Sequence, residues 1–237
     1  MLSVALSGGC GGGQPSPVIA SSSPSSQRDL EAARRAIAAR KSELPTSAFT
    51  ERVAVQIRFP KGGPGFEGRG AVAVDPGHAM RMIIVGPGGA TALDVWITHA
   101  KYRFAIPPVD RIERGAVRDA GATKLPVEFF RFWFLRRFEG KVGFADATHV
   151  VVRDGDAATS FDRGVFSQGT PFSAERRVGS AAATIAWWPK GSENAPERAE
   201  YVGGDGVRVD VRILGREDGV PQAAAFDDPD LAPPETP

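Results

Sequence analysis

Residues 49–59 read FTERVAVQIRF, and this stretch decides the fold class. Every second position from Phe49 to Phe59 is apolar except Glu51, and most of the positions between them are polar. A period of two is typical of a β-strand that turns one face to a core and the other to water. The chain around this stretch therefore needs to supply further strands and a cover for the apolar face.

The segments that follow repeat the same alternation over residues 66–75, 80–84, 93–97 and 102–106. Glycine or proline closes each segment, at Gly62-Gly63-Pro64, Asp75-Pro76-Gly77, Gly86-Pro87-Gly88-Gly89 and Pro107-Pro108. Short strands separated by such turns predict an antiparallel meander that is open to water on one side. With later segments near 142–152, Phe161, 185–188, Tyr201 and 207–213, we expect about ten strands.

A sheet of that size tends to curl. Gly68 and Gly70 lie inside a predicted strand, where glycine permits sharp bending. We therefore expect a mainly β fold with a few helices (α+β), in which a curled antiparallel sheet forms an incomplete β-barrel.

The first predicted helix covers residues 28–44. Its apolar residues recur at spacings of three, four and seven, Ser26 and Asp29 form a capping pattern at its start, and Pro45 ends it. Its outer side is expected to be basic and solvated, with a minority interpretation as a surface near anionic lipid, and carries Arg34, Arg35, Arg40 and Lys41.

The second predicted helix interrupts the strands at residues 125–137, LPVEFFRFWFLRR. Pro126 and Glu128 suit the first turn of a helix. Aromatic residues occupy five of six positions from Phe129 to Phe134, so the helix is apolar nearly all round. Two interpretations stay open: a buried core helix that crosses the sheet, or a lid over an apolar cavity.

Cys10 is the one cysteine of the chain, so it cannot belong to a disulfide framework. Small residues precede it and a Gly/Ser/Pro-rich run follows, which favours a lipid-modified cysteine; the alternative is an incidental small residue. Ser7 and the missing basic segment depart from the usual signal. A start codon assigned too late would explain the missing basic segment. We expect four parts, namely a partial lipoprotein signal over 1–10, a tether over 11–27, one folded domain over 28–220 and a disordered tail over 221–237.

The composition argues against several classes of function. Lys and Arg number 29 against 28 for Asp and Glu, so the net charge gives no reason to expect binding to nucleic acid. No run of residues approaches the ~18 apolar residues that a membrane-spanning helix needs. The three histidines, His78, His99 and His149, are isolated, so no metal site is expected. Carboxylates are not paired and no nucleotide or nucleophile motif occurs, so we expect neither an enzyme nor a bound cofactor.

The order of these features resembles the LolA/LolB family of bacterial lipoprotein carriers over about residues 28–215. The resemblance is strongest at Phe66-Glu67-Gly68-Arg69-Gly70, in RMIIVGPGG over 81–89, at Leu93-Asp94-Val95-Trp96, and where the aromatic helix is followed by Phe138-Glu139-Gly140. It implies an incomplete barrel with helices across its opening. With its lipoprotein-like segment around Cys10, the chain looks more like the membrane-bound LolB type than the soluble LolA type.

The resemblance further implies a lipid-anchored protein of the outer membrane that faces the periplasm, attaches through Cys10 and takes part in lipoprotein transport. Its partners would be acylated lipoproteins or lipid and a soluble LolA-like carrier, and we expect a monomer. The candidate residues for contact with acyl chains are Phe129, Phe130, Trp133, Phe134, Met80, Met82 and Val95. The alternative is a non-catalytic anchored scaffold, or a lipid-sensing interaction protein, of the same fold.

Overall fold

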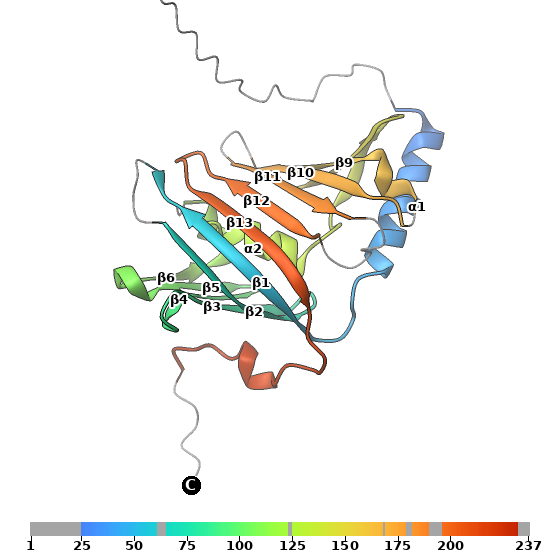
Figure 1. Ribbon diagram of the computed structural model, residues 1–237. Helices are drawn as coiled ribbons and strands as arrows, with labels where there is room; N and C mark the ends of the chain where they lie inside the picture. The colour runs from blue at the N-terminus through green and yellow to red at the C-terminus, as the bar shows by residue number, and fades with distance from the viewer. Residues whose placement is uncertain are drawn as a thin grey trace, which may run out of the picture.

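The computed structural model describes residues 25–60, 65–122, 125–167, 169–178, 182–189 and 196–231. Within these residues thirteen strands form one antiparallel sheet in the order β6-β5-β4-β3-β2-β1-β13-β12-β11-β10-β9-β8-β7 (Figure 1). The strands are β1 Phe49–Arg58, β2 Phe66–Asp75, β3 Ala79–Val85, β4 Thr91–Thr98, β5 Lys101–Ile106, β6 Arg111–Ala116, β7 Lys141–Ala145, β8 His149–Asp154, β9 Ala157–Asp162, β10 Phe172–Val178, β11 Ala182–Trp188, β12 Arg198–Val202 and β13 Arg208–Arg216.

The sheet consists of two meanders, β1–β6 and β7–β13, joined where β1 pairs with β13. Because β6 and β7 are the two open edges, the chain must travel from one edge of the sheet to the other between them. The helix α2 (Val127–Leu135) lies on this connection, and Figure 1 shows it behind β12 and β13. A mainly antiparallel sheet with two α-helices and without closure agrees with the expected fold class.

The expected number of about ten strands was too low. β6 and β10 were missed because their sequences, RIERGA and FSAERRV, mix charged and small residues and carry little apolar periodicity. Both gain their extended conformation from pairing with neighbours rather than from a strong local signal.

The concave face of the sheet is apolar and its outer face is mostly polar. Along β1 the burial alternates, and the buried positions include Val53, Val55 and Ile57. Glu51 shares that buried face with only 2% of its surface exposed. The predicted period-two pattern is therefore confirmed in β1, with one carboxylate placed inside the core.

The backbones of β2 and β3 approach each other closely at two glycines. A Cβ atom on Gly70 would lie 1.9 Å from the carbonyl oxygen of Ile83, and one on Gly68 would lie 2.5 Å from that of Val85. These glycines therefore let the β3 backbone approach β2 more closely than any side chain would allow.

The helix α1 (Gln27–Ser42) packs beside β7 and the 3-10 turn η4 (Arg163–Phe166). The predicted cap is confirmed, because Ser26 Oγ accepts a hydrogen bond from the Asp29 amide at 3.1 Å. The expectation for Arg40 was wrong. This side chain is 3% exposed and donates to the carbonyl oxygens of Gly164, Val165 and Ser167, so it anchors α1 rather than facing water.

The C-terminal tail differs from the expected disordered segment over 221–237. Residues 221–231 follow a defined course that includes the turn η5 (Ala223–Phe226), and residues 232–237 lie outside the described part. The Trp96 indole N–H donates to the carbonyl oxygen of Phe226 at 2.8 Å, and Asp230 pairs with Arg103 and Arg114. These contacts hold the tail against β4 and β5.

None of the described helices has the length and apolar character needed to cross a membrane.

We predict that Gly70→Ala lowers the free energy of unfolding by about 2–3 kcal/mol, since the added methyl group forces two backbones apart. Urea unfolding followed by circular dichroism measures the loss. Gly143→Ala is the matched control, because its Cβ would meet only the flexible side chain of Arg153, at 3.2 Å. Equal stability of the two variants would contradict the close backbone approach at Gly70.

Candidate functional site

The helix α2 lies on the concave face and contacts both meanders. Phe130 meets Phe104 of β5 with ring centroids 6.0 Å apart, and Phe129 meets Tyr201 of β12 at 5.7 Å. Trp133 meets Trp188 of β11 at 5.4 Å. One short helix thus touches strands from each half of the sheet. Burial beside Phe129 also raises the pKa of Tyr201, because the charged phenolate is disfavoured there.

The seven residues expected to contact acyl chains all lie inside this region. Each is at most 7% exposed, and all belong to one continuous hydrophobic cluster: Phe129, Phe130, Trp133, Phe134, Met80, Met82 and Val95. Residues from α2, β3 and β4 are therefore brought together in one cluster. Their contact with an acyl chain stays a prediction.

A small cavity remains between α2 and the strands β12 and β13 of the second meander. The line of contact between the helix and these strands is called the seam below. The cavity has a volume of about 10 Å³, which is room for about one water molecule. It is lined by Phe129, Trp133, Phe134, Arg137, Pro196, Ala199, Val211 and Ile213. In this conformation α2 fills the interior, so the structure favours the core-helix interpretation over a lid above an open cavity.

Arg137 follows α2 and brings a buried positive charge to this seam. Its guanidinium is 4% exposed; Nε donates to the carbonyl oxygen of Trp133, and Nη2 lies 4.0 Å from Glu51 Oε2. Burial lowers the pKa of Arg137, the Glu51 carboxylate raises it, and the positive charge of Arg216 lowers it again. The guanidinium keeps its charge throughout the physiological range.

Glu51 joins this charge to the sheet. Its Oε1 accepts a hydrogen bond from Arg216 Nη2 at 3.3 Å, across the β1–β13 pair. Arg216 is 37% exposed and stacks on the Phe49 ring at 4.2 Å. The side chains of Glu51, Arg137 and Arg216 are called the charge cluster here. They link the end of α2 to the β1–β13 pair, where the two meanders join.

Sequence reasoning did not select the charge cluster. The signal for Glu51 was present, because a carboxylate occupies a position on an otherwise apolar strand face. No sequence signal placed Arg137 opposite it, since 86 positions separate them and only the fold brings them together.

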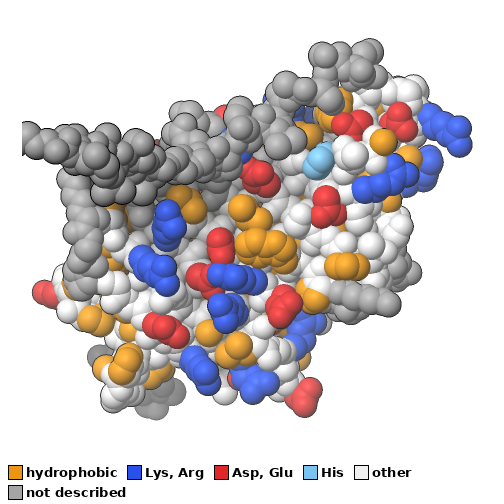
Figure 2. All heavy atoms as spheres, turned by 45° about the horizontal axis from the view of Figure 1, so that its top comes forward, with side chains coloured by type: hydrophobic (Ala, Val, Ile, Leu, Met, Phe, Trp, Pro, Cys, Tyr) orange, Lys and Arg blue, Asp and Glu red, His pale blue; other side chains and the backbone are white. Residues whose placement is uncertain are grey.

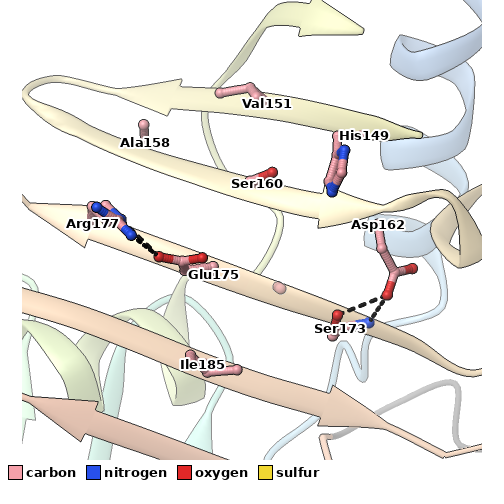
Figure 3. A pocket seen from close by; sticks show the side chains of 10 residues that line it. His149, Val151, Ala158, Ser160, Asp162, Ser173, Glu175, Arg177 and Ile185 are labelled. Carbon is pink, nitrogen blue, oxygen red and sulfur yellow. Dashed lines mark hydrogen bonds and ion pairs between the residues drawn. The ribbon is translucent and has the colours of Figure 1, made fainter. Parts of the chain in front are cut away.

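A second hollow, of about 170 Å³, lies on the outer face of β8–β11 (Figure 3). Its polar groups are committed to the fold: Asp162 accepts from the amide and hydroxyl of Ser173, each at 2.7 Å, and Glu175 pairs with Arg177. His149 and Ser160 line the same groove from β8 and β9. Two carboxylates and one guanidinium line the groove, and these charged groups are already partnered within the protein, so it is the weaker candidate.

The molecular surface supports this choice. In Figure 2, acidic and basic side chains are interspersed on the face that comes forward, with scattered hydrophobic ones between them. On the outer side of β11 and β12, Ile185, Trp187 and Val202 are each 37–40% exposed. Neither a single sign of charge nor a large apolar area marks a binding surface here.

The remaining sequence candidates add no site. Cys10 lies outside the described residues. Among the residues that the structure describes, no group of three His, Cys, Asp or Glu side chains is arranged to hold a metal ion.

Comparison with known proteins gives a fold but no close relative. The chain matches no family model, and no curated protein sequence is significantly similar to it. The crystal structure of a LolA superfamily protein from Nitrosomonas europaea superimposes with a TM-score of 0.53 at 12% identity, covering 87% of this chain and 99% of that chain. A putative outer membrane lipoprotein-sorting protein domain from Vibrio parahaemolyticus gives a TM-score of 0.43 at 10% identity, covering 84% and 96%. The fold of this chain is therefore LolA-like.

We predict that Glu51→Leu lowers the free energy of unfolding by about 3–5 kcal/mol, because Arg137 loses the carboxylate that offsets its burial. Arg216→Leu, which removes a partly exposed partner, should cost about 1 kcal/mol or less. Urea unfolding compares the two. A Glu51→Leu loss no larger than that of Arg216→Leu would show that the buried pair contributes nothing.

Proposed function

We propose that this protein binds the acyl chains of a lipid or lipoprotein in the bacterial envelope, without catalysis. The observation that carries the proposal is the position of α2 on the concave face of the sheet. A helix that is apolar nearly all round occupies the concave face of an open LolA-like sheet, and a seam with a small cavity runs along it. Displacement of α2 would replace aromatic rings by acyl chains on the same apolar wall.

The exchange is physically reasonable because the wall is already apolar. Burial of an acyl chain contributes roughly 25 cal/mol per Å² of apolar surface removed from water, which offsets the loss of the contacts of α2. The chain leaves α2 through Phe138 (φ 61°) and Gly140 (φ 120°), two residues in the left-handed region. This sharp change of direction marks the boundary between α2 and β7.

The finer role is part of the same proposal. Attachment through Cys10 would place the domain on the outer membrane, facing the periplasm, where a soluble LolA-like carrier would deliver acylated lipoproteins to a monomer. A LolB-type receptor is the specific form of this role. The lipoprotein-like segment before the first helix and the LolA-like fold support it.

A second candidate is an anchored scaffold with no cargo. The small size of the seam cavity favours it, because a core that admits only about one water molecule needs no ligand for its stability. The two candidates differ in one property, which is the ability of the interior to open.

Native mass spectrometry distinguishes them. The full chain carrying Cys10→Ser, so that no anchor of its own enters the cavity, is purified from bacterial cells. We expect co-purified lipid or acylated peptide, and we expect Trp133→Ala to raise that occupancy several-fold, because loss of this ring weakens the packing of α2 on the wall that the acyl chain takes.

Trp187→Ala is the matched control, since it is the same substitution on the outer face and should leave occupancy unchanged. A folded protein that never carries lipid, even after incubation with acylated peptide and lipid, would refute acyl binding and leave the scaffold.

A further inference from the structure

The outer face of the first meander carries a row of basic side chains around one indole ring. The row consists of directly paired residues from β3, β4, β5 and β6 in turn, namely Arg81, Trp96, Arg103 and Arg114. Phe104, the next residue along β5, belongs to the hydrophobic core, which places the row on the opposite, outer face. We call these four side chains the arginine row.

The sheet itself supplies little negative charge to this row. Arg103 and Arg114 are direct partners across the β5–β6 pair, and like charges in that position destabilise a sheet. Among the described strands, Asp94 of β4 is the carboxylate that pairs with the row, with Arg81 at 3.2 Å and with Arg103 at 3.1 Å. Three guanidinium groups therefore share one carboxylate of the sheet.

The C-terminal tail supplies a second carboxylate. Asp230 lies 3.0 Å from Arg103 and 3.1 Å from Arg114, so its negative charge offsets the repulsion between them. Trp96 is almost fully buried and donates its indole N–H to the main-chain carbonyl oxygen of Phe226 at 2.8 Å. The row thus binds a main-chain carbonyl and, four residues further along, a carboxylate.

The tail covers the outer face without becoming part of the sheet. It adds no strand, and its turn η5 lies beside β2 and β3 (Figure 1). Val220 and Leu231, two of the large apolar residues after β13, are exposed and contribute little burial. The pair between Asp230 and the exposed Arg114 is of the kind that contributes little net stability. A competing segment can therefore displace the tail.

We propose that the arginine row is a docking site for an acidic segment of a partner protein, which takes the place of the tail. The tail shows the chemistry that fits: a main-chain carbonyl for the Trp96 indole and a carboxylate for Arg103 and Arg114. With the tail displaced, three positive charges face one negative charge, so electrostatic attraction favours an acidic segment. The site lies on the outer face and does not depend on acyl binding at the concave face.

The tail is an internal competitor in this account. Because the chain tethers it to β13, its effective concentration at the row is on the order of millimolar. A free acidic segment therefore gains affinity when the contacts of the tail are weakened. Asp230 is the residue to change, since it carries the carboxylate of the tail that pairs with the row.

The test uses a labelled peptide with the sequence of residues 221–231, PQAAAFDDPDL, as the acidic probe. Fluorescence anisotropy measures its binding to the full chain. Asp230→Asn in the full chain should raise the affinity for this peptide about tenfold, because the internal competitor loses its charge-assisted hydrogen bonds. The same peptide with Asn in place of each Asp is the control probe and should bind to that variant at least about tenfold more weakly.

Further substitutions in the Asp230→Asn chain assign the binding to the row. Arg103→Gln and Trp96→Phe should each weaken the acidic peptide about five- to tenfold, because each removes a donor to it. Arg212→Gln is the matched control, since this exposed arginine of β13 lies outside the row and its loss should change the affinity by less than about twofold. Melting temperatures confirm folding, and the exposed Arg114→Gln replaces Arg103→Gln if that variant does not fold.

Three results would overturn this inference: no gain in affinity with Asp230→Asn, equal binding of the two peptides, or an equal loss in Arg212→Gln and Arg103→Gln. Binding of the Asp230→Asn chain to phosphatidylglycerol vesicles without binding of the acidic peptide would also overturn it and assign the row to an anionic membrane. None of these results bears on acyl binding, which lipid occupancy measures separately.

Discussion

The structure depends on the burial of one aromatic helix against the concave face of a curled sheet. The two meanders meet through the β1–β13 pair, and their inner faces are joined a second time by α2, which contacts β5 on one side and β11 and β12 on the other. Without that helix, the inner faces of thirteen strands would lie open to water. The connection between the two edge strands thus also supplies the cover of the core.

The same helix brings charge into the interior. Arg137 lies two residues after the end of α2. The carboxylate of Glu51, which lies on the apolar face of β1, helps to offset the cost of burying this guanidinium. A buried ion pair contributes little net stability compared with apolar residues of similar volume, although loss of one partner is costly.

The close-packed interior and a binding function are compatible. Aromatic side chains on α2 occupy the volume that a ligand would take, so the empty protein avoids an open apolar cavity in water. Under the proposed function, ligand binding is a competition between α2 and an acyl chain for the same wall.

The sequence by itself determined the local features. Alternation in residues 49–59 predicted β1 and its buried face, Ser26 predicted the start of α1, and the aromatic run at 129–134 predicted an apolar helix. These features follow from periods of two and 3.6 residues, which depend only on neighbours along the chain. β6 and β10 escaped this reasoning because partner strands, not their own sequences, hold them extended.

The tertiary structure alone decided the long-range contacts. It placed Arg40 in a buried contact with carbonyl oxygens more than 120 positions away, and it set Arg137 opposite Glu51. It also decided that α2 fills the interior in place of an open cavity. The spacing of residues along the chain does not predict such pairs. A charged side chain is expected to be exposed to solvent, and it is buried only where the fold supplies a partner that offsets the cost.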